Sequence, residues 1–295
     1  MTKGVLFGFL AYALFSCADA CVKGLGGTLS VFQIGFFITL ASLSTFGFSR
    51  AKNERWREVF RMNRPGLVFL RAGTGVAAGL LIIYAFTTIP FAEAYSVAFM
   101  MPLFATMLSI PILGEKIGWR RWLAVATGLA GVLLVVRPGF HALHLGHLAA
   151  ALAAAFSAVS MITLRLLGPT EKRISLLAAL YFSAITVNGL LMLTDFRTPN
   201  LIDVALIILG GVAGGFGQIA MLAATRLAPL NRVAPAQYSQ IIWAIGLGAL
   251  VFHEYPDHLA FAGMGLVVLS GLFTFLREEQ LRGWSRRTFL MRNRP

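Results

Sequence analysis

Long stretches without a charged residue alternate along the chain with short charged segments. Eight stretches contain no Asp, Glu, Lys or Arg, and two more contain a single charge, Asp19 or Arg71. A helix rises about 1.5 Å per residue, so nearly all of them are long enough to cross a hydrocarbon core of about 30 Å. The pattern predicts ten transmembrane helices. They correspond to Gly4–Val22, Gly24–Ser49, Gly66–Ala92, Ala94–Leu113, Trp122–Val136, Pro138–Leu164, Ile174–Thr194, Val204–Thr225, Val233–Phe252 and Leu259–Leu276.

The composition supports a membrane protein. Hydrophobic residues make up 58% of the chain and charged residues 13%, and the mean hydropathy is +0.77. A soluble domain has about 25% charged residues. Backbone groups in lipid must pair within a helix or a closed barrel, and no stretch alternates as barrel strands do. We therefore expect an all-α integral membrane protein.

The net charge of +13 would also suit a nucleic-acid partner, but the placement of the charges does not. With the N-terminus inside and ten spans, all but three of the 25 basic residues fall on the inner side; the exceptions are Lys23, Arg137 and Arg197. This asymmetry is what the positive-inside rule describes. The sequence predicts a multi-pass protein of the inner (cytoplasmic) membrane with both termini in the cytoplasm, and no nucleic-acid partner. Residues 279–295 would form a basic cytoplasmic tail.

The second half of the chain resembles the first. A shift of 139 residues places Gly75 on Gly214, Pro90 on Pro229 and Glu115 on Glu254. This alignment predicts two five-helix repeats, residues 1–139 and 140–278. Because five is odd, the second repeat enters the membrane from the opposite side, as in carriers that work by alternating access.

Two prolines fall within predicted spans. Pro102 leaves the carbonyl of Ala98 without its helical donor, and lipid cannot supply another. Pro235 does the same to Asn231, although a helix start would explain it equally well. We expect Pro102 to kink its helix, either toward a cavity or simply for packing.

The segment TTIPFAEAYSVAFMMPLFATMLSIPILGEKIGWRRWLAVATGLAGVLLVVRPG is echoed by YSQIIWAIGLGALVFHEYPDHLAFAGMGLVVLSGLF. Both resemble the EamA branch of the drug/metabolite transporter superfamily, near the S-adenosylmethionine and riboflavin carriers. The resemblance extends from about Gly4 to Glu278. It implies ten helices in two inverted repeats around a central cavity. The chain departs from the family pattern at His253, where the first repeat has a glycine, and around Thr39, where members often have an arginine.

Polar residues inside the spans are candidates for lining such a cavity, since they are costly in lipid. An aromatic surface with a few amides suits a flat or zwitterionic metabolite. The predicted substrate-binding and cavity residues are Asp19, Tyr84, Glu93, Gln218, Gln237, Tyr238, Gln240 and Trp243. Local explanations exist for two of them: Asp19 could pair with Lys23 one turn later, and Glu93 could stabilise a helix start.

Another set is expected to gate or stabilise the bundle: Lys23, Arg71, Pro102, Glu115, Pro235 and Glu254. Arg71 should extend toward the inner membrane surface, with contact to a substrate anion as the alternative. The two glutamates end their helices, where a negative charge is unfavourable, so they need partners. We expect Lys116 or Arg120 for Glu115, and His258 for Glu254. The repeated histidines His141, His144 and His147 leave a metal or pH-sensing site as an alternative to an ordinary loop.

No nucleophile–base set, phosphate-binding loop or metal-ligand spacing is present, so the sequence predicts neither an enzyme nor a cofactor or metal. The expected function is secondary transport of a small polar metabolite (amino-acid-like, S-adenosylmethionine-like or flavin-like). Proton coupling could run through Glu93 or Asp19, in a monomer or homodimer surrounded by lipid. The alternatives are a metabolite or multidrug exporter of broad specificity and a membrane-embedded lipid-modifying enzyme.

Overall fold

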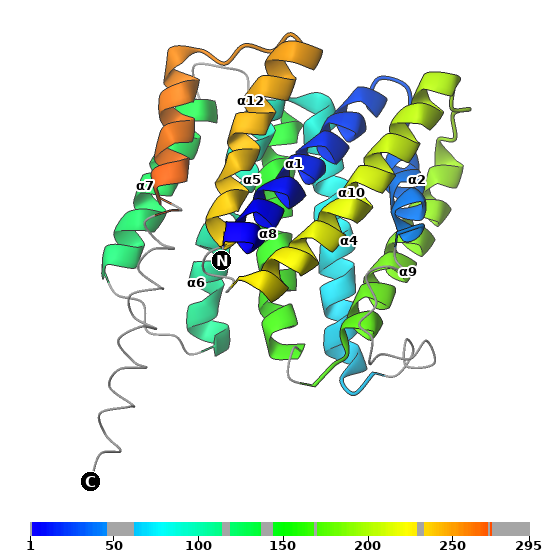
Figure 1. Ribbon diagram of the computed structural model, residues 1–295, viewed down its shortest axis with the longest axis horizontal. Coiled ribbons are helices and arrows are strands. Elements are labelled where there is room, and N and C mark those ends of the chain that lie inside the picture. The colour runs from blue at the N-terminus through cyan, green and yellow to red at the C-terminus, as the bar shows by residue number, and fades with distance from the viewer. Residues whose placement is uncertain are drawn as a thin grey trace.

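The computed structural model is a bundle of helices that run between two ends of the molecule (Figure 1). It describes residues 2–45, 62–113, 119–136, 144–167, 170–228, 233–270 and 272. No strand occurs among these residues. The helices are α1 Thr2–Leu25, α2 Val31–Leu43, α4 Pro65–Thr88, α5 Phe91–Ala98, α6 Met101–Leu113, α7 Trp119–Val136, α8 Leu145–Leu167, α9 Arg173–Leu191, η2 Met192–Thr194, α10 Leu201–Leu227, η3 Ala234–Tyr238, α12 Ser239–Val251 and a last helix, His258–Ser270.

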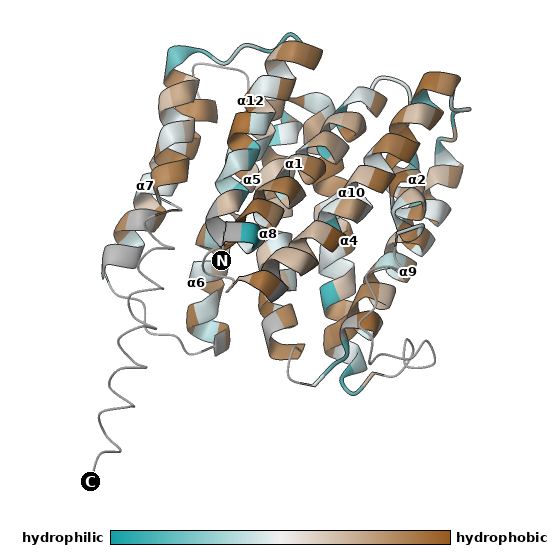
Figure 2. Ribbon diagram, viewed as in Figure 1, coloured by the Kyte–Doolittle hydropathy of each residue, from teal (hydrophilic) through white to brown (hydrophobic). Residues whose placement is uncertain are grey.

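Within the described ranges, six helical stretches are long and apolar enough to cross a membrane, and four shorter apolar helices accompany them. The predicted all-α architecture is therefore confirmed. Many large apolar side chains are exposed on the outside of the bundle. Figure 2 shows that the helices are mainly hydrophobic and that hydrophilic residues concentrate near their ends. The second helix is shorter than predicted, because Ser30 caps it and the Gln33 side chain completes a capping box.

Pro102 lies where the expected long helix is interrupted. α5 ends at Ala98, and α6 begins at Met101 after a turn at Phe99 and Met100. The amides of Leu103 and Phe104 both bond to the Met100 carbonyl. Pro235 lies in η3, the short 3-10 helix that leads into α12. Each half of the chain thus has an irregular segment beside its proline.

The two halves of the chain are interleaved. α1 packs along α10, and α4 packs along α8, so each packed pair takes one helix from each half (Figure 1). Glycines permit the close approach: a Cβ on Gly217 would strike Phe15, and one on Gly210 would press on Cys21 and Ile38. Small residues serve this purpose in membrane helices, where lipid gives no hydrophobic drive for association.

Helices at matching positions of the two predicted repeats run in opposite directions. The end of α1 and the start of α8 both lie beside Ile89: Lys23 Nζ donates to its carbonyl, and a Cβ on Gly146 would touch its side chain. α4 finishes at this same end, and α10 begins there, where Thr28 donates to Asp203 at 2.6 Å. We call this end of the bundle the lysine end.

The buried core is unequal along the bundle. At the lysine end, one large cluster joins residues of α1, α2, α4, α5, α7, α8, α10 and α12 with the last helix. At the opposite end, the described residues form smaller, separate clusters. One joins α4, α8 and α9 around Val68 and Leu176, and another joins Ala224, Ala228 and Val233.

Candidate functional site

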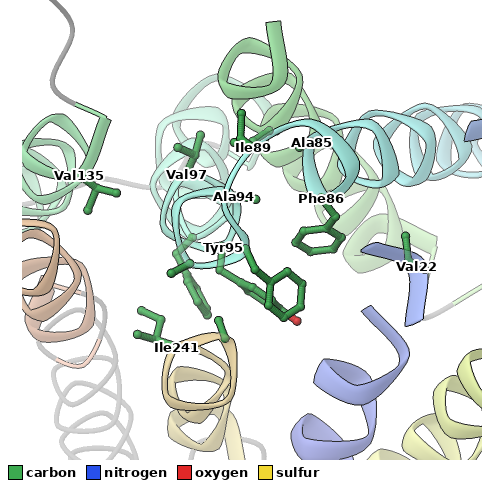
Figure 3. Close-up of a cluster of buried hydrophobic side chains, with 14 of the residues drawn as sticks. Val22, Ala85, Phe86, Ile89, Ala94, Tyr95, Val97, Val135 and Ile241 are labelled. Carbon is green, nitrogen blue, oxygen red and sulfur yellow. The ribbon is translucent and has the colours of Figure 1, made fainter. Parts of the chain in front are cut away.

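A polar cluster links α1, α5 and α12 beside the large apolar core. The Tyr95 hydroxyl donates to Asp19 Oδ2 at 2.5 Å, and Gln240 Nε2 lies 3.5 Å from the same hydroxyl. Tyr95 is 4% exposed, and Figure 3 shows its ring among the buried side chains with the hydroxyl directed to α1. We call Asp19, Tyr95 and Gln240 the tyrosine cluster. It connects the first half of the chain to the second through two of the predicted residues and one that was not predicted.

The Tyr95 ring is part of a row of aromatic rings along α5. Its ring lies 5.0 Å from that of Phe91 and 6.2 Å from that of Phe99, centroid to centroid. Phe99 in turn stacks on Tyr238 at 5.7 Å. The predicted residue Tyr238 therefore joins the tyrosine cluster through aromatic contacts rather than through its hydroxyl. Such a row offers stacking area to a flat group beside the polar atoms.

A second polar group, the lysine cluster, closes the lysine end. Lys23 Nζ lies 2.9 Å from Glu254 Oε1 and donates to the carbonyls of Phe86 and Ile89 at 3.2 and 2.9 Å. An ammonium group has three donors, and these contacts occupy all three. Glu254 Oε2 accepts the backbone amide of Phe91 at 2.7 Å, at the start of α5. One residue pair thus binds the ends of α1, α4, α5 and α12 together.

The backbone after α12 explains how Glu254 reaches this position. The Glu254 amide donates back to Gly248 at 2.9 Å, which turns the chain over the helix end, and His253 has a φ of 55°. This left-handed conformation is the one for which glycine is favoured after a helix. His253, which has a side chain, adopts this turn at some backbone cost.

A pocket of about 550 Å³ lies at the lysine end between α5, α7, α8, α12 and the last helix. We call it the glutamate pocket. Its ionisable lining residues are Glu93, His144, His147, Glu254, Tyr255 and Asp257. Glu93 Oε2 lies 3.0 Å from His147 Nε2, and the His144 amide donates to His147 Nδ1. Because Nδ1 accepts, the proton sits on Nε2 and His147 donates to Glu93.

These contacts correct several predictions. Lys23 pairs with Glu254 rather than with Asp19, so the expected pairing within α1 is wrong. The partner of Glu254 is likewise Lys23 and not His258. Arg71 is 9% exposed and donates to the Leu176 carbonyl at 2.9 Å, which fixes α4 to α9; its extension toward the inner membrane surface stays a prediction.

Other predicted residues lie apart from these clusters. Gln218 is exposed on α10, and Trp243 is 42% exposed on α12 beside the exposed Ile242. Tyr84 is half-buried, and neither Tyr84 nor Gln237 lines the glutamate pocket. Glu115 lies outside the described residues, as do Lys116 and His141. Among the described residues, no group of three or more His, Cys, Asp or Glu side chains could hold a metal ion.

Tyr95 could have been found from the sequence of α1. Tyr12, Ser16, Asp19 and Lys23 repeat with helical spacing and form one polar stripe on a membrane helix. A stripe of this kind needs polar partners on the facing helices. Between Glu93 and Pro102 the polar side chains are those of Tyr95 and Ser96, so the Tyr95 hydroxyl is one of two candidates for this partner.

Comparison with known proteins agrees with this architecture. The model of the EamA-like transporter family matches residues 2–137 and again residues 144–276. The chain belongs to the EamA-like transporter family. Members of the family are multi-pass membrane proteins that transport, so this chain is a membrane transporter and not an enzyme. The resemblance found in the sequence is confirmed.

Individual relatives are distant but cover nearly the whole chain. The S-adenosylmethionine uptake transporter of Rickettsia prowazekii (strain Madrid E) is 26% identical over 292 residues, which is 94% of each chain. The riboflavin transporter of Vibrio cholerae is 28% identical over 276 residues, 92% of this chain and 90% of that one. A solved crystal structure at 17% identity has a TM-score of 0.66 and covers 95% of this chain and 99% of its own, which shows the fold.

Proposed function

We propose that this transporter is a secondary carrier of a small polar metabolite that bears a cationic or zwitterionic, amino-acid-like group. It would work in the inner membrane with both termini in the cytoplasm. The tyrosine cluster is the observation that carries the proposal. It places a carboxylate, a phenol and an amide from both halves of the chain beside a row of aromatic rings. A carboxylate inside a membrane protein favours a cation, and the rings suit a flat neighbouring group.

The proposed cycle separates the α1–α10 pair from the α4–α8 pair, first at one end and then at the other. Support comes from the buried core of the described residues, which forms one cluster at the lysine end and separate clusters at the opposite end. With the N-terminus inside, the lysine end faces outward, and the described conformation is closed to the outside. The predicted inverted repeats, residues 1–139 and 140–278, would supply the two equivalent conformations. Their support is the opposite direction of α1 and α8.

Among possible substrates, S-adenosylmethionine fits this chemistry best. It has an ammonium group and a sulfonium group for carboxylates, and an adenine ring for aromatic contacts. The name of the Rickettsia relative agrees with that choice. Asp19 would bind the cation at the tyrosine cluster, and Glu93 would attract it at the outer pocket.

Transport into proteoliposomes tests the function. We expect saturable uptake of radiolabelled S-adenosylmethionine, competed by unlabelled substrate but not by neutral sugars. Asp19→Asn should lower uptake at least tenfold, because the carboxylate loses its charge. Asp195→Asn is the matched control: this carboxylate is 53% exposed, pairs with Arg197 in the exposed loop, and should leave uptake unchanged when replaced. Full uptake by Asp19→Asn would exclude the proposed site.

The pH dependence of the same uptake shows whether transport is coupled to the movement of a proton, and which carboxylate binds that proton. We propose Asp19 for this role, because it lies inside the bundle next to Tyr95, whereas Glu93 is paired with His147 near the entrance. Glu93→Gln should keep the pH dependence of the wild type, and Asp19→Asn should lose it in whatever uptake remains. Loss in Glu93→Gln alone would assign the role to Glu93 instead.

A further inference from the structure

One buried hydroxyl beside the tyrosine cluster has no hydrogen-bond partner. Ser16 lies on α1, one turn before Asp19, and is 0% exposed. Its Oγ has no partner among the described residues. Proteins satisfy nearly all buried polar atoms, and lipid offers no substitute for a missing partner. The orphan hydroxyl of Ser16 therefore requires an explanation, which the transport site described above does not supply.

Other buried hydroxyls on the helices of this protein are bonded within their own helix. Ser96 donates to the Ala92 carbonyl at 2.7 Å, and Thr163 donates to the Val159 carbonyl at 2.8 Å. A helix offers every interior serine a carbonyl of this kind, one turn earlier. Ser16 makes no such bond. Its hydroxyl is therefore available to a side chain of a neighbouring helix.

The neighbouring side chain is Tyr95 of α5. Ser16 Oγ lies close enough to the Tyr95 hydroxyl to act on it, but the two do not form a hydrogen bond. The Tyr95 proton is directed instead to Asp19 Oδ2. Gln240 presents Nε2 to the same hydroxyl, and an amide N–H cannot accept a hydrogen bond. Ser16 Oγ is thus a second acceptor beside that proton, buried from any ligand but not from Tyr95.

We propose that Ser16 is the alternate acceptor of the Tyr95 hydroxyl and thereby sets the affinity of Asp19 for the transported cation. The inference rests on the proposed function, in which Asp19 binds that cation. In the empty carrier, Tyr95 donates to Asp19. When the cation binds the carboxylate, Tyr95 donates to Ser16, and the Tyr95 oxygen keeps a lone pair for the cation. Ser16 is a positioning residue, because it acts through Tyr95 and does not touch the substrate.

This exchange explains why an unpaired hydroxyl is kept. A buried phenol that lost its acceptor to a cation would be left unsatisfied, and the cost would oppose binding. With Ser16 present, the unsatisfied hydroxyl belongs to the empty state, so its cost favours binding instead. The Tyr95 ring stays in place between Phe86 and Phe91. Only rotations about single bonds are needed, because the two hydroxyl groups already lie close together.

Binding of radiolabelled S-adenosylmethionine to the purified protein in nanodiscs, measured by equilibrium dialysis, gives the first test. Ser16→Ala should bind about tenfold more weakly, the effect of one hydrogen bond. Its thermal unfolding midpoint should equal that of the wild type or exceed it, because the orphan group is gone. A serine with a merely structural role would lower the midpoint when removed.

The same measurement in a second background identifies Tyr95 as the partner. Adding Ser16→Ala to Tyr95→Phe should change binding less than twofold, because no phenol hydroxyl remains. Ser96→Ala is the matched control, since Ser96 is also 0% exposed but bonded within its own helix, and it should bind as the wild type does. Unchanged affinity in Ser16→Ala, or an equal loss with and without Tyr95→Phe, would overturn the exchange.

A test without ligand separates this inference from the proposed function. Asp19→Leu removes the first acceptor, as a bound cation would, so Tyr95 must donate to Ser16. In that background, Ser16→Ala should lower the unfolding midpoint by about 2–4 °C, and in the wild-type background it should lower it not at all. Asp19→Ala serves the same purpose if Asp19→Leu does not fold. Absence of S-adenosylmethionine binding by the wild type would refute the proposed substrate, whereas equal midpoints with and without Ser16→Ala in the Asp19→Leu protein would refute the exchange.

Discussion

The two ends of the bundle are built differently. At the lysine end, Lys23, Glu254 and the amide of Phe91 connect four helix ends above one continuous apolar cluster. At the opposite end, the described helices still pack in pairs, but the buried residues around Val68 and those around Ala224 do not join. A protein that needed only stability would gain from closing both. Among the described residues, this difference is what the proposed alternating-access cycle requires of one state, with closure concentrated at a single end.

The largest effect should come from removing the cation at the lysine end. In Lys23→Met, the Glu254 carboxylate keeps its place with 27% side-chain exposure but loses its counter-charge. We expect a loss of about 2–4 kcal/mol of stability, less than for a fully buried pair because water reaches the carboxylate. The thermal unfolding midpoint of the purified protein measures it.

Opening of that end can be detected separately. Met264 is 2% exposed and lines the glutamate pocket. In a Cys17→Ser, Cys21→Ala background, Met264→Cys should react with a maleimide at least tenfold faster when Lys23→Met is added. Arg197→Met is the control, since it breaks only the exposed pair with Asp195. Equal labelling rates with and without the Lys23→Met substitution would show that the lysine cluster does not hold this end closed.

Backbone crowding at the lysine end gives the next effect. A Cβ on Gly26 would collide with the Cβ and Cγ2 of Thr87, at the junction of α1 and α4. Gly26→Ala should therefore cost about 1–3 kcal/mol, typical of overpacking. The adjacent Gly27 has nothing within 4 Å, so Gly27→Ala should change the unfolding midpoint little. Equal behaviour of the two variants would mean that the junction is not tightly packed.

Tyr95→Phe tests the tyrosine cluster, which lies beside the large apolar core. The substitution removes the donor to Asp19 and keeps the aromatic row, so we expect a loss of about 1.5–3 kcal/mol for a hydrogen bond to a charged group. Substrate uptake should fall with it. Ser96→Ala is the control on the next residue, because that hydroxyl bonds to Ala92 of its own helix. A Tyr95→Phe protein as stable and active as Ser96→Ala would remove the tyrosine cluster from the mechanism.

The smallest effect is expected at the half-open glutamate pocket. His147→Gln replaces one N–H donor to Glu93 by another, so less than about 1.5 kcal/mol, the value of a single hydrogen bond, is at stake. Stability should hardly change, while the concentration for half-maximal uptake shifts no more than a few-fold. His258→Gln, on an exposed position outside the pocket, is the comparison. A large loss of stability in His147→Gln alone would place this pair within the closing contacts.

The helices were predicted well from the sequence, because a sufficiently long uncharged stretch inserts into lipid as a helix regardless of its tertiary contacts. Asp19, Gln240 and Glu254 were also predicted as important, since polar groups are rare in such helices. The partners predicted for two of them, Lys23 for Asp19 and His258 for Glu254, were wrong. The spacing rule that paired Asp19 with Lys23 is local, whereas Lys23 meets Glu254 from the far end of the chain. Gln218 and Trp243 are exposed because of the way α10 and α12 are rotated about their axes. The hydrophobic pattern of a single helix does not determine that rotation.

The interleaving of the two halves bears on how the molecule is made. α1 and α4 find their main neighbours, α10 and α8, in the second half of the chain, which is synthesised after them. α4 must therefore wait in the bilayer until α8 has been synthesised, and α1 must wait longer, until α10 has been synthesised. Assembly of these pairs would follow insertion, and a chain truncated near its middle would lack the most extensive contacts of both helices.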